Sequence, residues 1–237
     1  VLAQEGGRRE SKEKNRSCNR SGHLTVVAHV AASNERSTVN IFERHAKILA
    51  LVLVLIASAR IAATWRVFNA TTDEPAHIAC GMEWLDRQTY RLEDQHPPLA
   101  RVAAALGPYL FGIRSPRNTG QDLSRQGAAI LLAQGRLDRN LASARAGILP
   151  FFWIACVVVF LWARRILGST GGLLALLLFT NVQPVLAHAA LATTDMALTG
   201  TLGAAVLSTL YWLENTRSLS RRLCACCFGM PLPGREV

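Results

Sequence analysis

Carboxylates and histidines, the usual groups of general acid–base chemistry, occur in this chain in two short polar stretches beside apolar runs. The stretch TTDEPAH holds Asp73, Glu74 and His77, and the stretch LATTDMA holds Asp195. The two stretches are far apart in the sequence, but each one closely follows an apolar run. If both runs cross a membrane in the same direction, the acids meet at one membrane face and form a candidate active site.

Four apolar runs predict that the chain crosses a membrane several times. Half of the 237 residues are hydrophobic and the mean hydropathy is +0.21, with the apolar residues gathered in segments. A helix needs about 20 apolar residues to cross a bilayer. The predicted spans cover residues 46–65, 147–163, 171–192 and 196–213. We therefore expect an all-α, polytopic membrane domain over residues 46–214.

The distribution of basic residues predicts which helix ends share a side of the membrane. The formal net charge is +10, and basic residues cluster before the first span, at Arg164-Arg165 and over 217–222. Because basic flanks stay on the cytoplasmic side, the loop 66–146 and the turn 192–195 are expected outside. No zinc-ligand spacing or aromatic–basic motif accompanies the charge, which disfavours a nucleic-acid-binding protein. The predicted location is the plasma membrane or cell inner membrane, as a multi-pass protein.

The outer loop is expected to hold helices that lie at the membrane surface. Apolar residues recur at i, i+4 and i+7 in IACGMEWL, and a second stripe follows the Pro97-Pro98 pair, which favours a helix start. These two re-entrant or interfacial helices would hold Asp73, Glu74, His96 and Arg101 near the lipid headgroups. A connecting helix is expected over GAAILLAQGRLDRN.

The two ends of the chain differ from the apolar domain. Residues 1–45 are basic and lack periodicity, and we expect them to be disordered or an artefactual extension. The tail 215–237 continues no pattern, and we interpret it as a truncated or frame-shifted end. Its three cysteines lack a second ligand cluster, so they do not predict a metal site.

Two motifs resemble those of a known family. The stretch DEPAHIACGMEWL…YRLEDQHPPLARVAAAL, followed about 90 residues later by LAHAALATTDMALT, resembles the N-terminal part of the bacterial PMT-like glycosyltransferases. These enzymes of glycosyltransferase family 39 are relatives of the protein O-mannosyltransferases and the lipid A aminoarabinose transferases, and have the GT-C membrane fold. The resemblance covers about residues 46–214. Since family members are longer, it implies the N-terminal half of that fold, and we expect this chain alone to be inactive.

The resemblance implies transfer of a sugar from a polyprenyl- or dolichyl-phosphate carrier to a protein or lipid acceptor at the outer face. Asp73 is then the candidate general base, and its neighbour Glu74 orients the acceptor or holds a metal. The implied substrate-binding residues, for lipid phosphate and acceptor, are His77, His96, Arg101 and Asp195. No cofactor is certain, and a divalent metal with undetermined ligands is a candidate.

Several polar residues of these stretches also have a purely structural explanation. Asp73 and Glu74 can cap the helix that follows them, and Asp195 can cap the fourth span. His96 can be an ordinary interfacial histidine, and His188 can hydrogen-bond a neighbouring helix.

Two other functions stay open. A transporter-like membrane protein is one alternative, because Asn181, Gln183 and Pro184 interrupt the third apolar run, and transporters use broken helices at binding sites. An inactive, truncated remnant of the transferase is the other.

Overall fold

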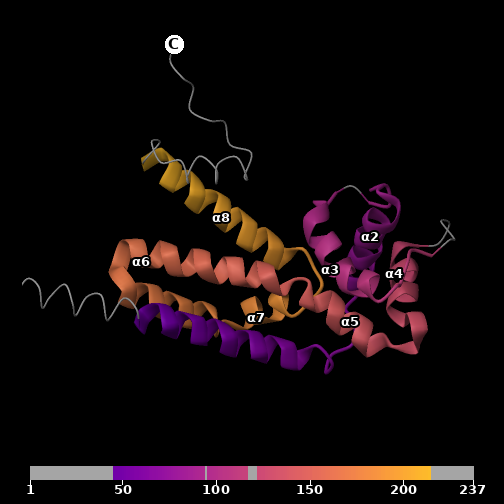
Figure 1. Cartoon of the computed structure of the whole chain (residues 1–237), viewed down its shortest axis with the longest axis horizontal. Helices are drawn as coiled ribbons and strands as arrows, with labels where there is room; N and C mark the ends of the chain where they lie inside the picture. The colour runs from indigo at the N-terminus through magenta and orange to yellow at the C-terminus, as the bar shows by residue number, and fades with distance from the viewer. Residues whose placement is uncertain (1–44, 94, 117–121, 215–237) are drawn as a thin grey trace, which may run out of the picture. The chain divides into compact units, whose positions relative to one another are not determined.

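The computed structural model describes residues 45–93, 95–116 and 122–214, and every regular element in this part of the chain is a helix (Figure 1). The predictions for residues 1–44 and 215–237 lie outside the described residues. The chain divides into a unit Val1–Ile48 and a unit Leu49–Val237. All contacts described below belong to the second unit.

Three helices in the described part are long and apolar enough to cross a membrane, which indicates a membrane protein. They are His45–Thr64, the continuous stretch Leu137–Phe179, and α8, which covers Asp195–Glu214. The first and the last agree with the predicted spans within two residues. The predicted count of four spans is not confirmed.

The long middle stretch is a short helix followed by a sharply bent one. It comprises α5 (Leu137–Ala146) and α6 (Leu149–Phe179), and α6 is interrupted at Gly168, whose φ of 71° and ψ of −172° are not helical. This backbone region is accessible almost only to glycine. The chain reverses direction at Gly168 (Figure 1). The two arms lie close together, since a Cβ at Gly172 would be only 3.0 Å from the carbonyl oxygen of Phe160. The predicted turn after Arg164-Arg165 is thus present as a helical hairpin.

The prediction of one continuous third span over 171–192 is wrong. The returning arm of α6 ends at Phe179, and the short helix α7 covers Gln183–Ala189. Pro184 lies in the first turn of α7, where its missing N–H costs nothing. At the break, Nη1 of Arg60 donates to Asn181 Oδ1 (2.8 Å) and more weakly to the Thr180 carbonyl (3.4 Å).

The loop between the first two membrane-length helices forms a bundle of short helices. It contains α2 (Glu74–Arg87), α3 (Pro98–Leu110), α4 (Leu123–Leu132) and the 3₁₀ turn η1 (Ala133–Gly135), and leads into α5. The two surface helices predicted after Pro75 and Pro97 are therefore present. The single connecting helix predicted over 127–140 is wrong, because the chain kinks at Gln134 and divides it into α4 and α5.

Helix α2 is the centre of this bundle, packed between α3 and α4. It approaches α3 so closely that a side chain at Gly81 would collide with the Arg101 carbonyl. Its predicted apolar face is buried at Ile78 and Met82, against protein rather than lipid. Helix α3 buries its alanines instead and leaves Leu106 and Leu110 exposed, so its outer stripe remains available to a bilayer.

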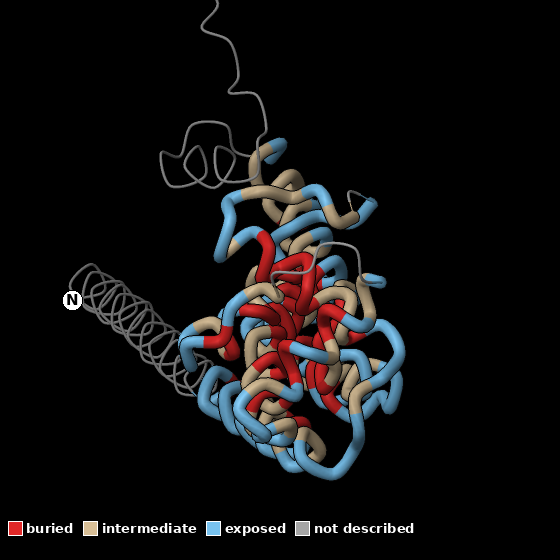
Figure 2. The backbone as a smooth tube through the Cα atoms, turned by 90° about the vertical axis from the view of Figure 1, so that its right-hand side faces the viewer, coloured by how far each residue is buried: buried red, intermediate tan, exposed pale blue. Residues whose placement is uncertain are grey.

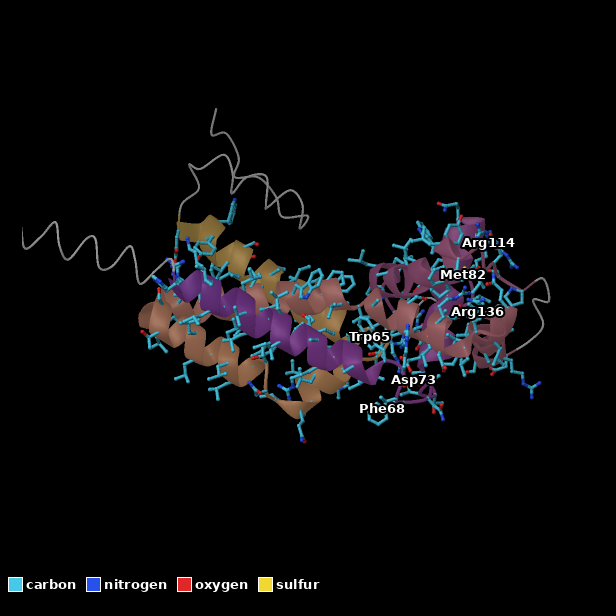
Figure 3. The ribbon with its side chains drawn as sticks, turned by 60° about the horizontal axis from the view of Figure 1, so that its bottom comes forward. Trp65, Phe68, Asp73, Met82, Arg114 and Arg136 are labelled. Atoms are coloured by element: carbon cyan, nitrogen blue, oxygen red, sulfur yellow. The ribbon has the colours of Figure 1, made fainter. Side chains whose placement is uncertain are left out.

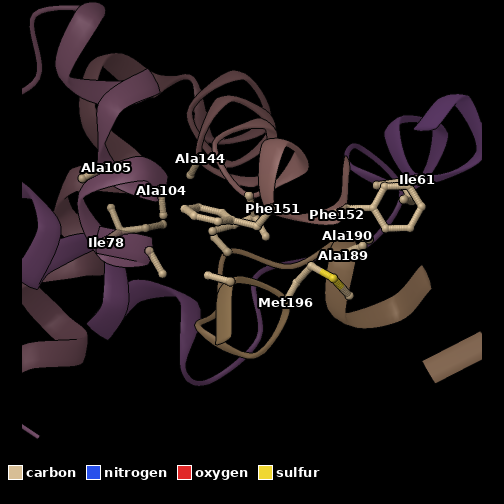
Figure 4. Packing of buried hydrophobic residues seen from close by; sticks show 14 of the residues in the cluster. Ile61, Ile78, Ala104, Ala105, Ala144, Phe151, Phe152, Ala189, Ala190 and Met196 are labelled. Atoms are coloured by element: carbon tan, nitrogen blue, oxygen red, sulfur yellow. The ribbon is translucent and has the colours of Figure 1, made fainter. Parts of the chain in front are cut away.

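One apolar core joins the bundle to the membrane-length helices. Phe151 and Phe152, at the start of α6, belong to the same cluster as Ala104 of α3, Ala144 of α5 and Met196 of α8 (Figure 4). Figure 2 shows the buried backbone gathered in the interior, with exposed segments around it. This core fixes the bundle at one end of the α6–α8 pair, where both polar stretches begin.

Candidate functional site

A buried ion pair lies at the junction of the bundle and the long helices. Glu74 and Arg145 are 0% and 1% exposed. Nε and Nη2 of Arg145 donate to the two oxygens of Glu74 at 2.8 and 2.9 Å, a bidentate arrangement. Arg145 also donates to the carbonyls of Trp65, Phe68 and Asn69 at 2.9–3.0 Å. The guanidinium therefore holds α5, the start of α2 and the end of the first helix together.

Glu74 also connects the two polar stretches of the sequence. The backbone N–H of Ala192 donates to Glu74 Oε1 (2.8 Å), and the N–H of Thr71 donates to Oε2 (2.9 Å). Asp73 adjoins Glu74, and Asp195 follows Ala192 by three residues, so these contacts bring the two acids near each other. The exposed surface around Asp73 and Asp195 is called the rim below. Burial alone would raise the pKa of Glu74, but the hydrogen bonds from Arg145, Ala192 and Thr71, with the charge of Arg145, lower it below its usual value.

Asp73 is exposed at this rim and is not used as a helix cap. It occupies the N-cap position of α2, but its side chain makes no capping hydrogen bond. Figure 3 shows it with Trp65 and Phe68 at the end of the first long helix. The Asp73 side chain therefore does not cap the helix. The Glu74 carboxylate, in contrast, is fully engaged in hydrogen bonds that hold the fold together.

Arg101 lies at the centre of a polar cluster built from the loop between α2 and α3. Its guanidinium is 1% exposed. Nη1 donates to the Tyr90 hydroxyl (2.9 Å), Nη2 pairs with the Glu93 carboxylate and approaches Nδ1 of His96 (2.9 Å), and Tyr90 donates to the His96 carbonyl (2.8 Å). His96 and Arg101, predicted to bind phosphate, are thus adjacent, and Glu93 is the anion that faces them in this structure.

His77 joins the Arg101 cluster to the acids. Nε of Arg101 donates to Nδ1 of His77 (3.0 Å), so the proton of the neutral ring lies on Nε2. Burial, together with the charges of Arg101 and His96, lowers the pKa of His77, and the carboxylates of Asp73 and Asp195 partly oppose this shift. His77 is consequently a neutral imidazole at neutral pH that both acids influence.

Asp195 makes its own contacts at the rim. Its Oδ2 accepts from the Thr193 hydroxyl (3.0 Å) and lies 3.1 Å from Nδ1 of His188. Both side chains are about half exposed. His188 of α7 therefore hydrogen-bonds a neighbouring helix, as its structural explanation expected, and the residue it contacts is Asp195, the first residue of α8.

A mainly apolar hollow of about 520 Å³ adjoins the rim. It lies between the end of the first long helix and α7, with Thr71 and Arg145 on its wall. Arg60 also lines it; only Nη1 of that guanidinium hydrogen-bonds within the described part of the chain. The hollow can accept an apolar chain whose polar end reaches the rim.

The sequence did not reveal three important partners, namely Arg145, Tyr90 and Glu93. Tyr90 and Glu93 lie inside the motif YRLEDQHPPLA, so the motif itself was the available signal. Arg145, two residues before an uncharged apolar run, offered a weaker one. Among the described residues, no three His, Cys, Asp or Glu side chains are grouped so as to hold a metal ion, and metal use stays a prediction.

Comparison of the chain with protein-family models, with curated proteins and with solved structures finds no match.

Proposed function

We propose that this chain is part of a membrane glycosyltransferase of the GT-C type, which transfers a sugar from a polyprenyl-phosphate carrier to an acceptor at the outer membrane face. The observation that carries the proposal is the hydrogen bond between Ala192 and Glu74. It joins the two polar stretches. Asp73, which is exposed and makes no helix-capping hydrogen bond, therefore shares the rim with Asp195 beside the long apolar helices.

Asp73 is the general base in this proposal. A sugar-accepting hydroxyl is a poor nucleophile, and a carboxylate within hydrogen-bond reach activates it. Asp73 is exposed and has no capping bond that would have to break first. Glu74, bound to Arg145, acts instead as the positioning residue that holds Asp73 at the rim.

The Arg101 cluster is the candidate site for the carrier phosphate. Guanidinium and imidazole groups bind phosphate oxygens, and Arg101 and His96 are already adjacent. Glu93 would leave Arg101 when phosphate enters, since both anions compete for the same donors. The apolar hollow beside Thr71 suits the polyprenyl chain.

The transporter alternative has less support. The break between α6 and α7 is bonded to Arg60, four residues before the end of the first helix. It therefore lies near the interface, whereas a transporter site is expected near the membrane midplane.

The test is sugar transfer from radiolabelled polyprenyl-phosphate sugars by membranes that contain the longest available form of the chain. We expect Asp73→Asn to lower turnover by about 10²–10⁴-fold, the usual contribution of a general base, while donor binding is kept. Arg91→Gln, an exposed change on the adjacent loop, is the control. Near-normal turnover of Asp73→Asn at normal expression would remove Asp73 from catalysis.

A further inference from the structure

A second hollow, separate from the candidate site, is dominated by arginines. It measures about 470 Å³, and its lining comprises Arg66, Gly135, Arg136, Leu137, Asp138 and Arg139. Three of these lining residues are arginines, and only one, Asp138, is an acid. We propose that this hollow binds the phosphate of an anionic membrane-lipid headgroup.

Within the described part of the chain, Arg139 is held in place without an acidic partner. Its guanidinium stacks 4.3 Å from the centre of the Phe111 ring and donates to Gln134 Oε1 (2.8 Å) and Asn140 Oδ1 (3.0 Å). Asn140 is fully buried, and its amide donates to the carbonyls of Leu131 and Ala133. The charge of Arg139 is therefore positioned but not neutralised.

The turn that creates the hollow has an uncommon backbone. Gln134 and Gly135 are both left-handed, with φ values of 61° and 64°. A side-chain-bearing residue such as Gln134 adopts this region infrequently. The turn separates α4 from α5 and sets Arg136 directly before α5 (Figure 3).

Two of the arginines have no side-chain partner in the described part of the chain. Arg66 and Arg136 are exposed, and neither side chain makes a hydrogen bond or ion pair there. Asp138, the one acid of the lining, is likewise unpaired with them. A phosphate, which accepts several charge-assisted hydrogen bonds, matches this uncompensated set of donors.

The position of Arg66 assigns the phosphate to a lipid rather than to a free anion. Arg66 follows by two residues Thr64, the last residue of the first membrane-length helix. Lipid phosphates lie at that level, just beyond the hydrocarbon core. A headgroup beside Arg66 enters the same hollow that Arg136 and Arg139 line.

The experiment uses the whole 237-residue chain in an uncharged detergent, with thermal unfolding followed by tryptophan fluorescence. Dioctanoyl phosphatidylglycerol should raise the unfolding temperature in a saturable manner, because a ligand that binds only the folded state stabilises it. Dioctanoyl phosphatidylcholine should not. Arg136→Gln and Arg66→Gln should each weaken the apparent affinity by about tenfold or more, and Asp138→Asn should strengthen it.

The matched control is Arg125→Gln, which removes the same charge from an exposed position on α4 outside the hollow. Its affinity should equal that of the unaltered chain. Equal weakening by Arg125→Gln and Arg136→Gln, or equal stabilisation by the two lipids, would overturn the proposal. Stabilisation by glycerol 3-phosphate as strong as that by phosphatidylglycerol would overturn the assignment to a lipid.

Discussion

At the level of single residues, the sequence predicted that the two acidic stretches lie together, but it could not predict how differently their acids are surrounded. Asp73 and Glu74 are neighbours with the same carboxylate chemistry, and Glu74 differs chiefly through its distant partners Arg145 and Ala192. Those partners are 71 and 118 residues away from Glu74, and no periodicity connects them. Contacts of this kind are determined by the packed fold rather than by local pattern.

The buried pair predicts an asymmetric response to substitution. Arg145→Met leaves the Glu74 carboxylate buried without its cation, a change that typically costs about 3–5 kcal/mol. Glu74→Gln should cost less, because Arg145 keeps three carbonyl acceptors. Thermal unfolding in uncharged detergent measures both. Equal destabilisation by the two variants would mean that the carbonyl contacts contribute nothing.

His77 predicts a loss of stability on mild acidification. Its pKa is lower in the folded chain than its ordinary value of 6.5, so the folded state takes up the proton less readily than the unfolded state. The stability contributed by the neutral ring is complete above about pH 6.5 and decreases as pH falls below it. We expect His77→Gln to remove part of the decline in unfolding temperature between pH 6.5 and 5. An unchanged pH profile in this variant would contradict the assignment.

Glu74 also makes the folded chain less stable as pH falls, but in a lower pH range than His77. Its lowered pKa means that its stabilisation is present above the ordinary value of 4.5 and is lost as pH falls further. The losses of stability caused by His77 and by Glu74 can therefore be distinguished by the pH ranges in which they occur.

At the level of elements, apolar length and proline position predicted much of the helical order. The helix starts after Asp73 and Pro97 and the turn after Arg164-Arg165 are all present. The third span and the connecting helix failed for related reasons. In both, the helix is interrupted by a local change of backbone conformation, at Thr180–Val182 and at Gln134. Hydropathy does not predict such a change.

The hairpin in α6 predicts a specific cross-link. A Cβ at Gly172 would lie 3.0 Å from the Cβ of Arg164, and a small outward shift would bring the two atoms to the roughly 3.5–4.5 Å that a disulfide needs. In an uninterrupted helix, eight residues would separate these positions by about 12 Å. In a background without native cysteines, Arg164→Cys with Gly172→Cys should form a disulfide under mild oxidation, detected by protection from maleimide–polyethylene glycol.

The control for this cross-link is the same pair in a chain with Gly168→Val, which cannot easily adopt the backbone of the turn. We expect less disulfide there. Full reactivity of both thiols in the parent pair would exclude the hairpin.

At the level of the whole molecule, the distribution of basic residues predicts which segments face each side of the membrane. The site and the arginine hollow belong to segments that the basic flanks assign to the outside. Single cysteines at Arg125 and Thr194 should react with an impermeant maleimide applied to intact cells, whereas one at Thr170, on the hairpin, should not. All three positions are described, and Arg125 and Thr170 are exposed. Labelling of Thr170→Cys from outside would invert the topology.

The contacts of Glu74 also impose an order on how the protein is made. Thr71 leaves the ribosome with Glu74, Arg145 follows 71 residues later, and Ala192 arrives only when the chain is 118 residues past Glu74. Until then the two acidic stretches cannot be joined, although two membrane-length stretches have already been synthesised. The rim is therefore completed late in biogenesis. A nascent chain halted before Ala192 could form the ion pair between Glu74 and Arg145, but it would lack the contact that brings Asp195 to the rim.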